Sequence, residues 1–133
     1  MKLFALPLFF LLLALCGVKS LASPQSDAEG SVRRISATQA HTMMSELAEF
    51  TLLDVRSPQE FRGQRIEGAL SIPANEISAR AATLLPDKNR VILVYCQSGR
   101  RSAAAARELV RLGYLNVYDF GGIRGWRYGT VSN

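Results

Sequence analysis

Compact apolar runs alternate with stretches of helical periodicity along most of the chain. Strands are expected at 33–35, 50–55, 69–72, 91–95 and 116–120. Helices or helix starts are expected at 37–49, from 57 onward, and at 75–85, 103–112 and 123–128. The run 91–95 has no polar alternation, as is typical of a strand covered on both faces. The alternation therefore predicts an α/β domain with a small, mostly parallel sheet and helices on both faces.

The first part of the chain follows a different pattern. Lys2 supplies an early positive charge, and the residues at 3–18 carry no charge. Ser20 and Ala22 then place small side chains three residues and one residue before a possible cleavage site. This layout predicts a secretory signal peptide over residues 1–22.

Cleavage would leave a flexible polar leader over 23–31 and a folded domain over 32–133. The mature protein is then expected in the periplasm or outside the cell, without a membrane segment. Two alternatives stay open. The apolar run could be retained as an anchor, although it is short for a span of about 20 residues, or Cys16 could be lipidated.

Composition narrows the classes of function. The chain has 133 residues, of which 48% are hydrophobic and 20% charged, which indicates one folded domain rather than a disordered tail. Loss of Lys2 and Lys19 would lower the net charge from +5 to +3. No run of five basic residues is present, so no nucleic-acid partner is expected. One His and two Cys cannot form a four-ligand zinc site, so no metal is expected.

Candidate chemistry gathers at Cys96, which follows the strand at 91–95 and precedes a helix. In parallel α/β sheets, ligands bind beyond the carboxyl ends of the strands. Backbone amides and the helix dipole would lower the pKa of a thiol there, and Arg100 and Arg101 would add positive charge. Gly99 allows the amides to converge on an anion. Cys96 is therefore a candidate nucleophile, the alternatives being an inert buried thiol or a disulfide between chains.

The spacing within this loop distinguishes between reaction classes. With Cys96 as the first residue, Arg101 is the sixth, whereas a tyrosine-phosphatase loop has its Arg at the seventh position, where Ser102 stands. The shorter loop narrows the anion site, which favours a sulfur atom carried on the cysteine over a tetrahedral phosphoryl group. A thiol phosphatase or arsenate reductase remains an alternative hypothesis.

Several segments together resemble the rhodanese family, in particular its single-domain, exported members. They are 52–56 with Glu60 and Phe61, 68–73, 94–102 with Ala104 and Ala105, 112–114, 116–117, and 121–122 with Trp126. The resemblance covers about residues 35–127 and implies a rhodanese-like fold with a five-stranded sheet. It also implies a thiosulfate sulfurtransferase, which would move sulfane sulfur from thiosulfate or a similar donor to cyanide or a thiol through a persulfide on Cys96. No cofactor is implied.

The resemblance also implies roles for individual residues. Cys96 matches the nucleophile, and Asp54 and Arg56 match residues that support the neighbouring strand end. The loop that holds the persulfide and the substrate matches Gln97, Ser98, Gly99, Arg100, Arg101 and Ser102. The expected partners are a small anionic sulfur donor and a thiol or cyanide acceptor, and the protein is expected to be a monomer. A second hypothesis is a rhodanese-like binding or persulfide-carrier module with low turnover of small molecules.

Two features depart from the family pattern. The family usually has Gly-His-Ile where this chain has Gln64, Arg65 and Ile66, so the role of Arg65 is open. The chain also ends soon after Trp126, without the longer tail of many relatives. Whether Trp126 lines the pocket or fills the core therefore stays open at the level of the sequence.

Overall fold

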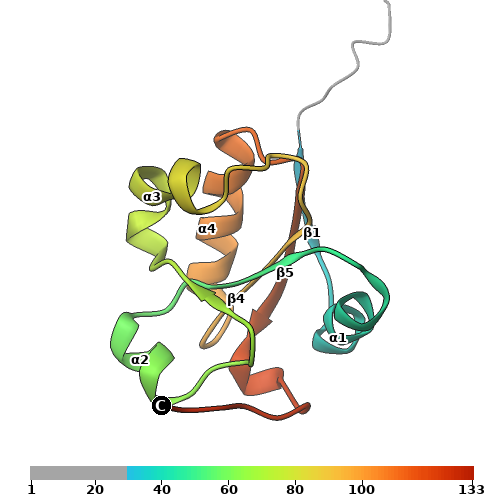
Figure 1. Ribbon diagram of the computed structural model, residues 1–133, viewed down its shortest axis with the longest axis vertical. Coiled ribbons are helices and arrows are strands. Elements are labelled where there is room, and N and C mark those ends of the chain that lie inside the picture. Colours follow the sequence, from blue (N-terminus) through green and yellow to red (C-terminus); the bar gives the residue numbers. More distant parts are fainter. Residues whose placement is uncertain (1–29) are drawn as a thin grey trace, which may run out of the picture.

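The computed structural model describes residues 30–133 (Figure 1). Its strands are β1 (Ser31–Arg34), β2 (Thr51–Asp54), β3 (Leu70–Ser71), β4 (Ile92–Cys96) and β5 (Asn116–Gly122). Its helices are α1 (Ala37–Glu46), α2 (Pro58–Gly63), α3 (Ile77–Leu84) and α4 (Arg100–Arg111), with 3-10 turns at η1 (Ala74–Glu76) and η2 (Ile123–Gly125). The predicted signal peptide and most of the predicted leader lie outside the described residues.

The five strands form one sheet in the order β1-β5-β4-β2-β3, and every strand pair is parallel. The predicted fold class, a small parallel sheet in an α/β domain, is therefore confirmed. All residues of the central strand β4 are buried, which explains its lack of polar alternation. Because the strands are parallel, the carboxyl ends of β2, β4 and β5 meet at one edge of the sheet, where Cys96 ends β4.

Helices cover both faces of the sheet, as predicted. Figure 1 shows α1 on one side of the strands and α3 and α4 on the other. Alternate residues of each strand point to opposite faces, so Leu53 and Val94 pack in the core under α3 and α4. Their neighbours Leu52 and Leu93 pack with Ala40 of α1 in a second core. The sheet thus lies between two apolar layers. Its faces are covered, and the carboxyl ends of the strands remain open for a site.

Capping boxes fix where two helices begin. Ser36 Oγ accepts a hydrogen bond from the Gln39 amide, and the Gln39 side chain accepts one from the Ser36 amide, so the two residues form a capping box at the start of α1. Ser57 and Glu60 form a second box at the start of α2, where Pro58 occupies the first turn. The second box also holds the Glu60 carboxylate at the edge of the sheet where the strands end.

Several element boundaries differ from those expected. α4 begins at Arg100 rather than at residue 103, because the cap lies at Gly99 and not at the start of the alanine run. The helix expected over 123–128 is only the turn η2, and α1 ends at Glu46. Ser31, the last residue of the predicted leader, already pairs with β5. These differences arise because strand pairing and backbone conformation, rather than residue periodicity, end each element.

Candidate active site

Cys96 ends β4 at a local irregularity of the sheet. The register between β4 and β5 shifts between Val94 and Cys96, so that Cys96 lies opposite Gly122. Such irregularities occur often beside active sites, because they redirect a side chain. A Cβ on Gly122 would lie 2.2 Å from the carbonyl oxygen of Gln97. Only a glycine therefore lets β5 approach the loop this closely.

The loop surrounds the Cys96 sulfur with hydrogen-bond donors. The Gly99 amide donates to Sγ at 3.0 Å. Burial is the largest single influence and raises the pKa of the thiol, but the Ser102 hydroxyl and the amides of Ser102, Gly99 and Ser98 together lower it below its usual value. Ser102 Oγ also lies 3.1 Å from the Gly99 carbonyl oxygen and has one proton to give. Because this proton can go either to the carbonyl oxygen or to the sulfur, the backbone amides stabilise the thiolate more consistently than the Ser102 hydroxyl does.

Gly99 determines how the loop turns into α4. Its φ of 101° lies in the left-handed region that favours glycine, and it is the N-cap residue of the helix. No side chain caps α4 in the usual way. Instead, the Gly99 amide points to the Cys96 sulfur, so the thiol lies beside the positive end of the α4 dipole.

The two arginines of the loop differ in their surroundings. Arg101 pairs with Glu60 through two hydrogen bonds, with N–O distances of 2.8 and 2.9 Å. This pair lowers the pKa of Glu60 to about 2. Arg100 is exposed and makes no side-chain hydrogen bond within residues 30–133. Arg101 therefore keeps its positive charge, but the Glu60 carboxylate offsets it.

Asp54 and Arg56 form a buried ion pair beneath the loop. Their exposed fractions are 0% and 2%, and the Arg56 Nη2 to Asp54 Oδ2 distance is 2.7 Å. The guanidinium also donates to the Gln64 carbonyl oxygen and, at 3.4 Å, to Oε1 of Gln97. Arg56 thus contacts the loop through Gln97, and Asp54 is linked to the loop through Arg56. Their supporting role remains a prediction.

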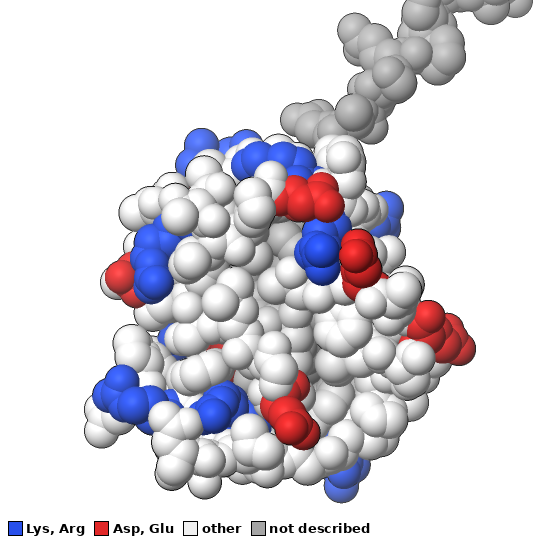
Figure 2. Space-filling model, viewed as in Figure 1, with Lys and Arg blue, Asp and Glu red and all other residues white. Residues whose placement is uncertain are grey.

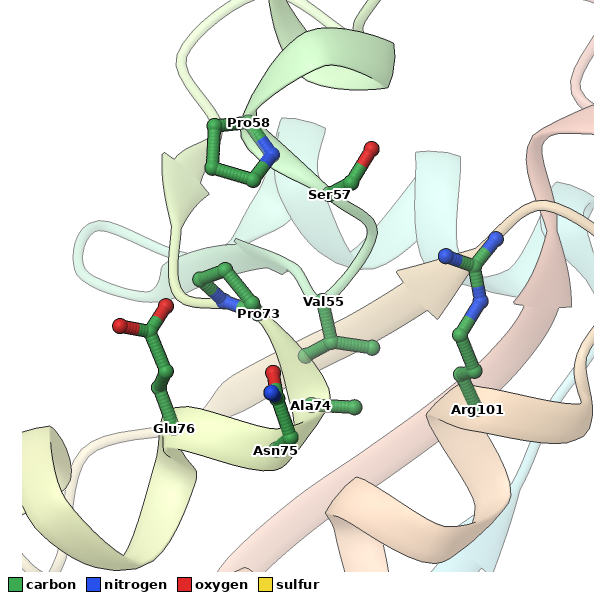
Figure 3. Close-up of a pocket in the computed structure, with 8 residues that line it drawn as sticks. All are labelled: Val55, Ser57, Pro58, Pro73, Ala74, Asn75, Glu76 and Arg101. Atoms are coloured by element: carbon green, nitrogen blue, oxygen red, sulfur yellow. The ribbon is translucent and has the colours of Figure 1, made fainter.

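A cleft of about 480 Å³ opens beside the loop (Figure 3). It is lined by Val55, Ser57, Pro58, Pro73, Ala74, Asn75, Glu76 and Arg101. Cys96 is 1% exposed and does not line the cleft directly. Glu60 and, to a smaller extent, Cys96 raise the pKa of Arg101, so the guanidinium on the cleft wall lies within electrostatic range of the thiol.

Three further observations concern residues 30–133. No group of three or more His, Cys, Asp or Glu side chains in this part of the chain is arranged to hold a metal ion. None of the helices in the same range is long and apolar enough to span a membrane. On the face shown in Figure 2, Lys and Arg side chains form separate groups with Asp and Glu between them.

Comparison with known proteins identifies the family. The Rhodanese-like domain matches residues 36–128. The chain belongs to the rhodanese-like family. It is 40% identical over 72 residues to Thiosulfate sulfurtransferase PspE of Escherichia coli, a match that covers 54% of this chain and 69% of that protein. It is 32% identical over 96 residues to a Sulfurtransferase of Allochromatium vinosum, which covers 71% of this chain and 88% of the relative.

The rhodanese-like fold is also found in solved structures. A structure described as a rhodanese with anions from E. coli superposes with a TM-score of 0.59 at 36% identity. The superposition covers 62% of this chain and 98% of that chain. The resemblance noted in the sequence motifs is thus confirmed at the level of the family and the fold.

Three features of this rhodanese-like site were not expected from the sequence. They are the pairing of Glu60 with Arg101, the hydrogen bond from Arg56 to the Gln64 carbonyl oxygen, and the close approach of Gly122 to the loop. The sequence places Glu60 in the first turn of a helix. Nothing local signalled its second partner, which is 41 positions away.

Proposed function

We propose that this rhodanese-like protein is a thiosulfate sulfurtransferase in which Cys96 carries the transferred sulfur as a persulfide. In the first half-reaction, the Cys96 thiolate attacks the outer sulfur of thiosulfate. A bond forms between Sγ and that sulfur, the bond to the sulfite sulfur breaks, and sulfite leaves with the electron pair. Similar proteins that are named sulfurtransferases support the reaction class.

The observation that carries the proposal is the 3.0 Å hydrogen bond from the Gly99 amide to the Cys96 sulfur. A thiolate and a persulfide anion both place negative charge on sulfur in this loop, so amides already directed at Sγ stabilise both. The lowered pKa of Cys96 increases the thiolate fraction near neutral pH. The loop is thus suited to stabilise both the thiolate nucleophile and the persulfide that it forms.

Donor binding is assigned to the rest of the loop. Thiosulfate is a dianion, so the exposed Arg100 attracts it. Arg101 gives one N–H from each of two nitrogens to Glu60 and retains three others. Glu60 thereby holds the guanidinium in one orientation while leaving donors for a small anion. Backbone amides from Gln97 to Ser102 complete the anion site.

In the second half-reaction, an acceptor removes the outer sulfur from Cys96. Cyanide attacks that sulfur, the bond between it and Sγ breaks, and the electron pair returns to Sγ as thiocyanate leaves. A thiol acceptor follows the same course and releases its proton to solvent. The protein then returns to the thiolate form, so neither a metal nor an organic cofactor enters this scheme.

A thiosulfate–cyanide assay of the wild type and of Cys96→Ser tests this proposal. We expect the variant to lose transfer by at least about a thousandfold, because the attacking atom is missing. Its free energy of unfolding should stay within about 1 kcal/mol of the wild type, since Ser is similar in shape. Intact mass after thiosulfate treatment should rise by one sulfur in the wild type alone.

The outcomes of this assay separate the hypotheses. Transfer by Cys96→Ser at the wild-type rate would refute the nucleophile assignment. A persulfide that forms on the wild type without turnover would favour the carrier module instead. Faster hydrolysis of aryl phosphates than sulfur transfer would favour the phosphatase hypothesis.

The proposed location is the periplasm or the exterior of the cell. The proposal is supported by the charge and hydrophobicity pattern of residues 1–22. A secreted sample whose mass corresponds to a chain starting at Ser23 would agree with it. A chain that retains residues 1–22, or one with a lipid on Cys16, would contradict cleavage before Ser23, and a chain that stays in the cytoplasm would contradict the proposed location.

A further inference from the structure

The cleft beside the loop carries opposite charges on its two sides. Of its lining residues, only Arg101 and Glu76 are charged. Figure 3 shows Arg101 projecting from the start of α4 on one side and Glu76 from η1 on the other, with Val55 and Ala74 between them. A molecule that fills this cleft therefore meets on one side a cation that interacts electrostatically with the Cys96 thiol, and on the other side an anion.

The two charged side chains differ in how easily each can bind a ligand. The Arg101 guanidinium is already held by Glu60 at 2.8 and 2.9 Å. Within residues 30–133, Glu76 pairs with Arg80 at 3.7 Å on the next turn of the helix, and the two side chains are 44% and 45% exposed. Exposed pairs of this kind contribute little. The Glu76 carboxylate can therefore exchange Arg80 for a ligand.

We propose that the sulfur acceptor in this cleft is a small thiol that also carries an ammonium group, which Glu76 binds. This inference rests on the proposed sulfur transfer and names its acceptor class. A volume of about 480 Å³ exceeds the needs of a bare thiol or cyanide and accommodates an amino thiol. The apolar floor at Val55 and Ala74 receives the carbon atoms that join the two groups.

The bound acceptor has its sulfur toward the loop and its ammonium toward Glu76. Its sulfur bonds to the outer sulfur of the Cys96 persulfide, the bond from that sulfur to Sγ breaks, and the electron pair returns to Sγ. The acceptor thiol releases its proton to solvent, so atoms and charge balance. Arg101 lies on the side of the cleft where the acceptor sulfur binds. Its positive charge stabilises the negative charge that passes between the sulfur atoms during the transfer.

Three thiols of similar size test the charge preference. Cysteamine carries an ammonium group, 2-mercaptoethanol is neutral and 3-mercaptopropionate carries a carboxylate. With thiosulfate as donor, we expect kcat/KM to follow the order cysteamine, mercaptoethanol, mercaptopropionate. In Glu76→Gln the ratio of kcat/KM for cysteamine to that for mercaptopropionate should fall about fivefold, as expected for loss of one partly exposed ion pair.

Two variants make the test specific. Arg80→Gln should raise the same ratio, because it removes the competing partner of Glu76. Glu46→Gln makes the same charge change as Glu76→Gln at an exposed position of α1, which packs on the other face of the sheet. We expect it to leave the ratio at the wild-type value. Opposite effects of two surface changes on one ratio would not arise from a general loss of structure.

The results of the thiol comparison separate failure of the inference about Glu76 from failure of the proposed function. Equal kcat/KM for the three thiols, or an unchanged ratio in Glu76→Gln, would overturn the inference while cyanide turnover still upheld the proposed function. A fall in the ratio for Glu46→Gln as large as for Glu76→Gln would overturn it too, by showing a long-range charge effect. Absence of transfer to cyanide as well as to all thiols would refute the proposed function itself.

Discussion

Replacing Gly122 with Ala would test how closely β5 must approach the catalytic loop. Gly122 has a φ of −107°, which any residue can adopt, so backbone strain is not the obstacle. The added Cβ would lie 2.2 Å from the Gln97 carbonyl oxygen, 2.7 Å from its carbon and 2.8 Å from the Ser98 Cα. All three are backbone atoms, so no side-chain rotation relieves the contact. The loop itself has to move.

The size of the effect follows from these distances. Ordinary van der Waals contact begins at 3.4 Å, so Gln97 must withdraw from β5 by about 1 Å, and overpacking of this kind costs about 1–3 kcal/mol. The same displacement moves the amides of Ser98 and Gly99 relative to the Cys96 sulfur. A misplacement of about 1 Å at a reacting group can lower the rate by about a hundredfold. We therefore expect a loss of about 2 kcal/mol in stability and of about a hundredfold in kcat/KM for thiosulfate.

Urea denaturation and the thiosulfate–cyanide assay measure these two quantities. Gly63→Ala is the matched control, because nothing lies within 4 Å of a Cβ at that position. Gly63 is the last residue of α2, where alanine is the better helix former, so the control should be equal to the wild type or more stable by up to about 1 kcal/mol.

Either of two results would contradict this role of Gly122. If Gly122→Ala transfers sulfur at the wild-type rate, the close approach does not position the loop. If Gly63→Ala loses as much activity as Gly122→Ala, the effect belongs to any added methyl group and not to the loop contact.

Two further predictions concern ionisation. The Arg101 pair lowers the pKa of Glu60 from 4.5 to about 2, so the stability contributed by Glu60 is present above about pH 4.5 and is lost as the pH falls toward 2. Glu60→Gln should flatten this part of the urea-midpoint profile, and superimposable profiles would contradict the ion pair. Hydrogen bonds from the loop lower the pKa of Cys96, so its alkylation by iodoacetamide should reach half-maximum at lower pH than that of a free cysteine peptide. Ser102→Ala should move this midpoint to higher pH, and a shift to lower pH would count against the proposed donor.

Local patterns in the sequence already predicted most of the fold. The apolar run at 91–95 indicated a buried strand, and Ser36 and Ser57 are typical cap residues at the two helix starts expected near 37 and 57. The position of Cys96 between a strand and a helix placed it at the ligand-binding edge of a parallel sheet. These features were predictable because periodicity and capping involve residues within about four positions of one another.

The electrostatics of the site were decided only by the tertiary structure. The sequence shows that Arg101 is a cation, but it does not show that folding brings the guanidinium to Glu60, 41 positions away. It also gives no sign that Gly122 contacts the loop, whereas the shifted register with β4 brings Gly122 close to Gln97 and Ser98. Both contacts depend on which strands are neighbours in the sheet, and no local pattern encodes that order. The sequence by itself therefore determined which residues could react, and the packing of β2, β4 and β5 determined their charges and distances.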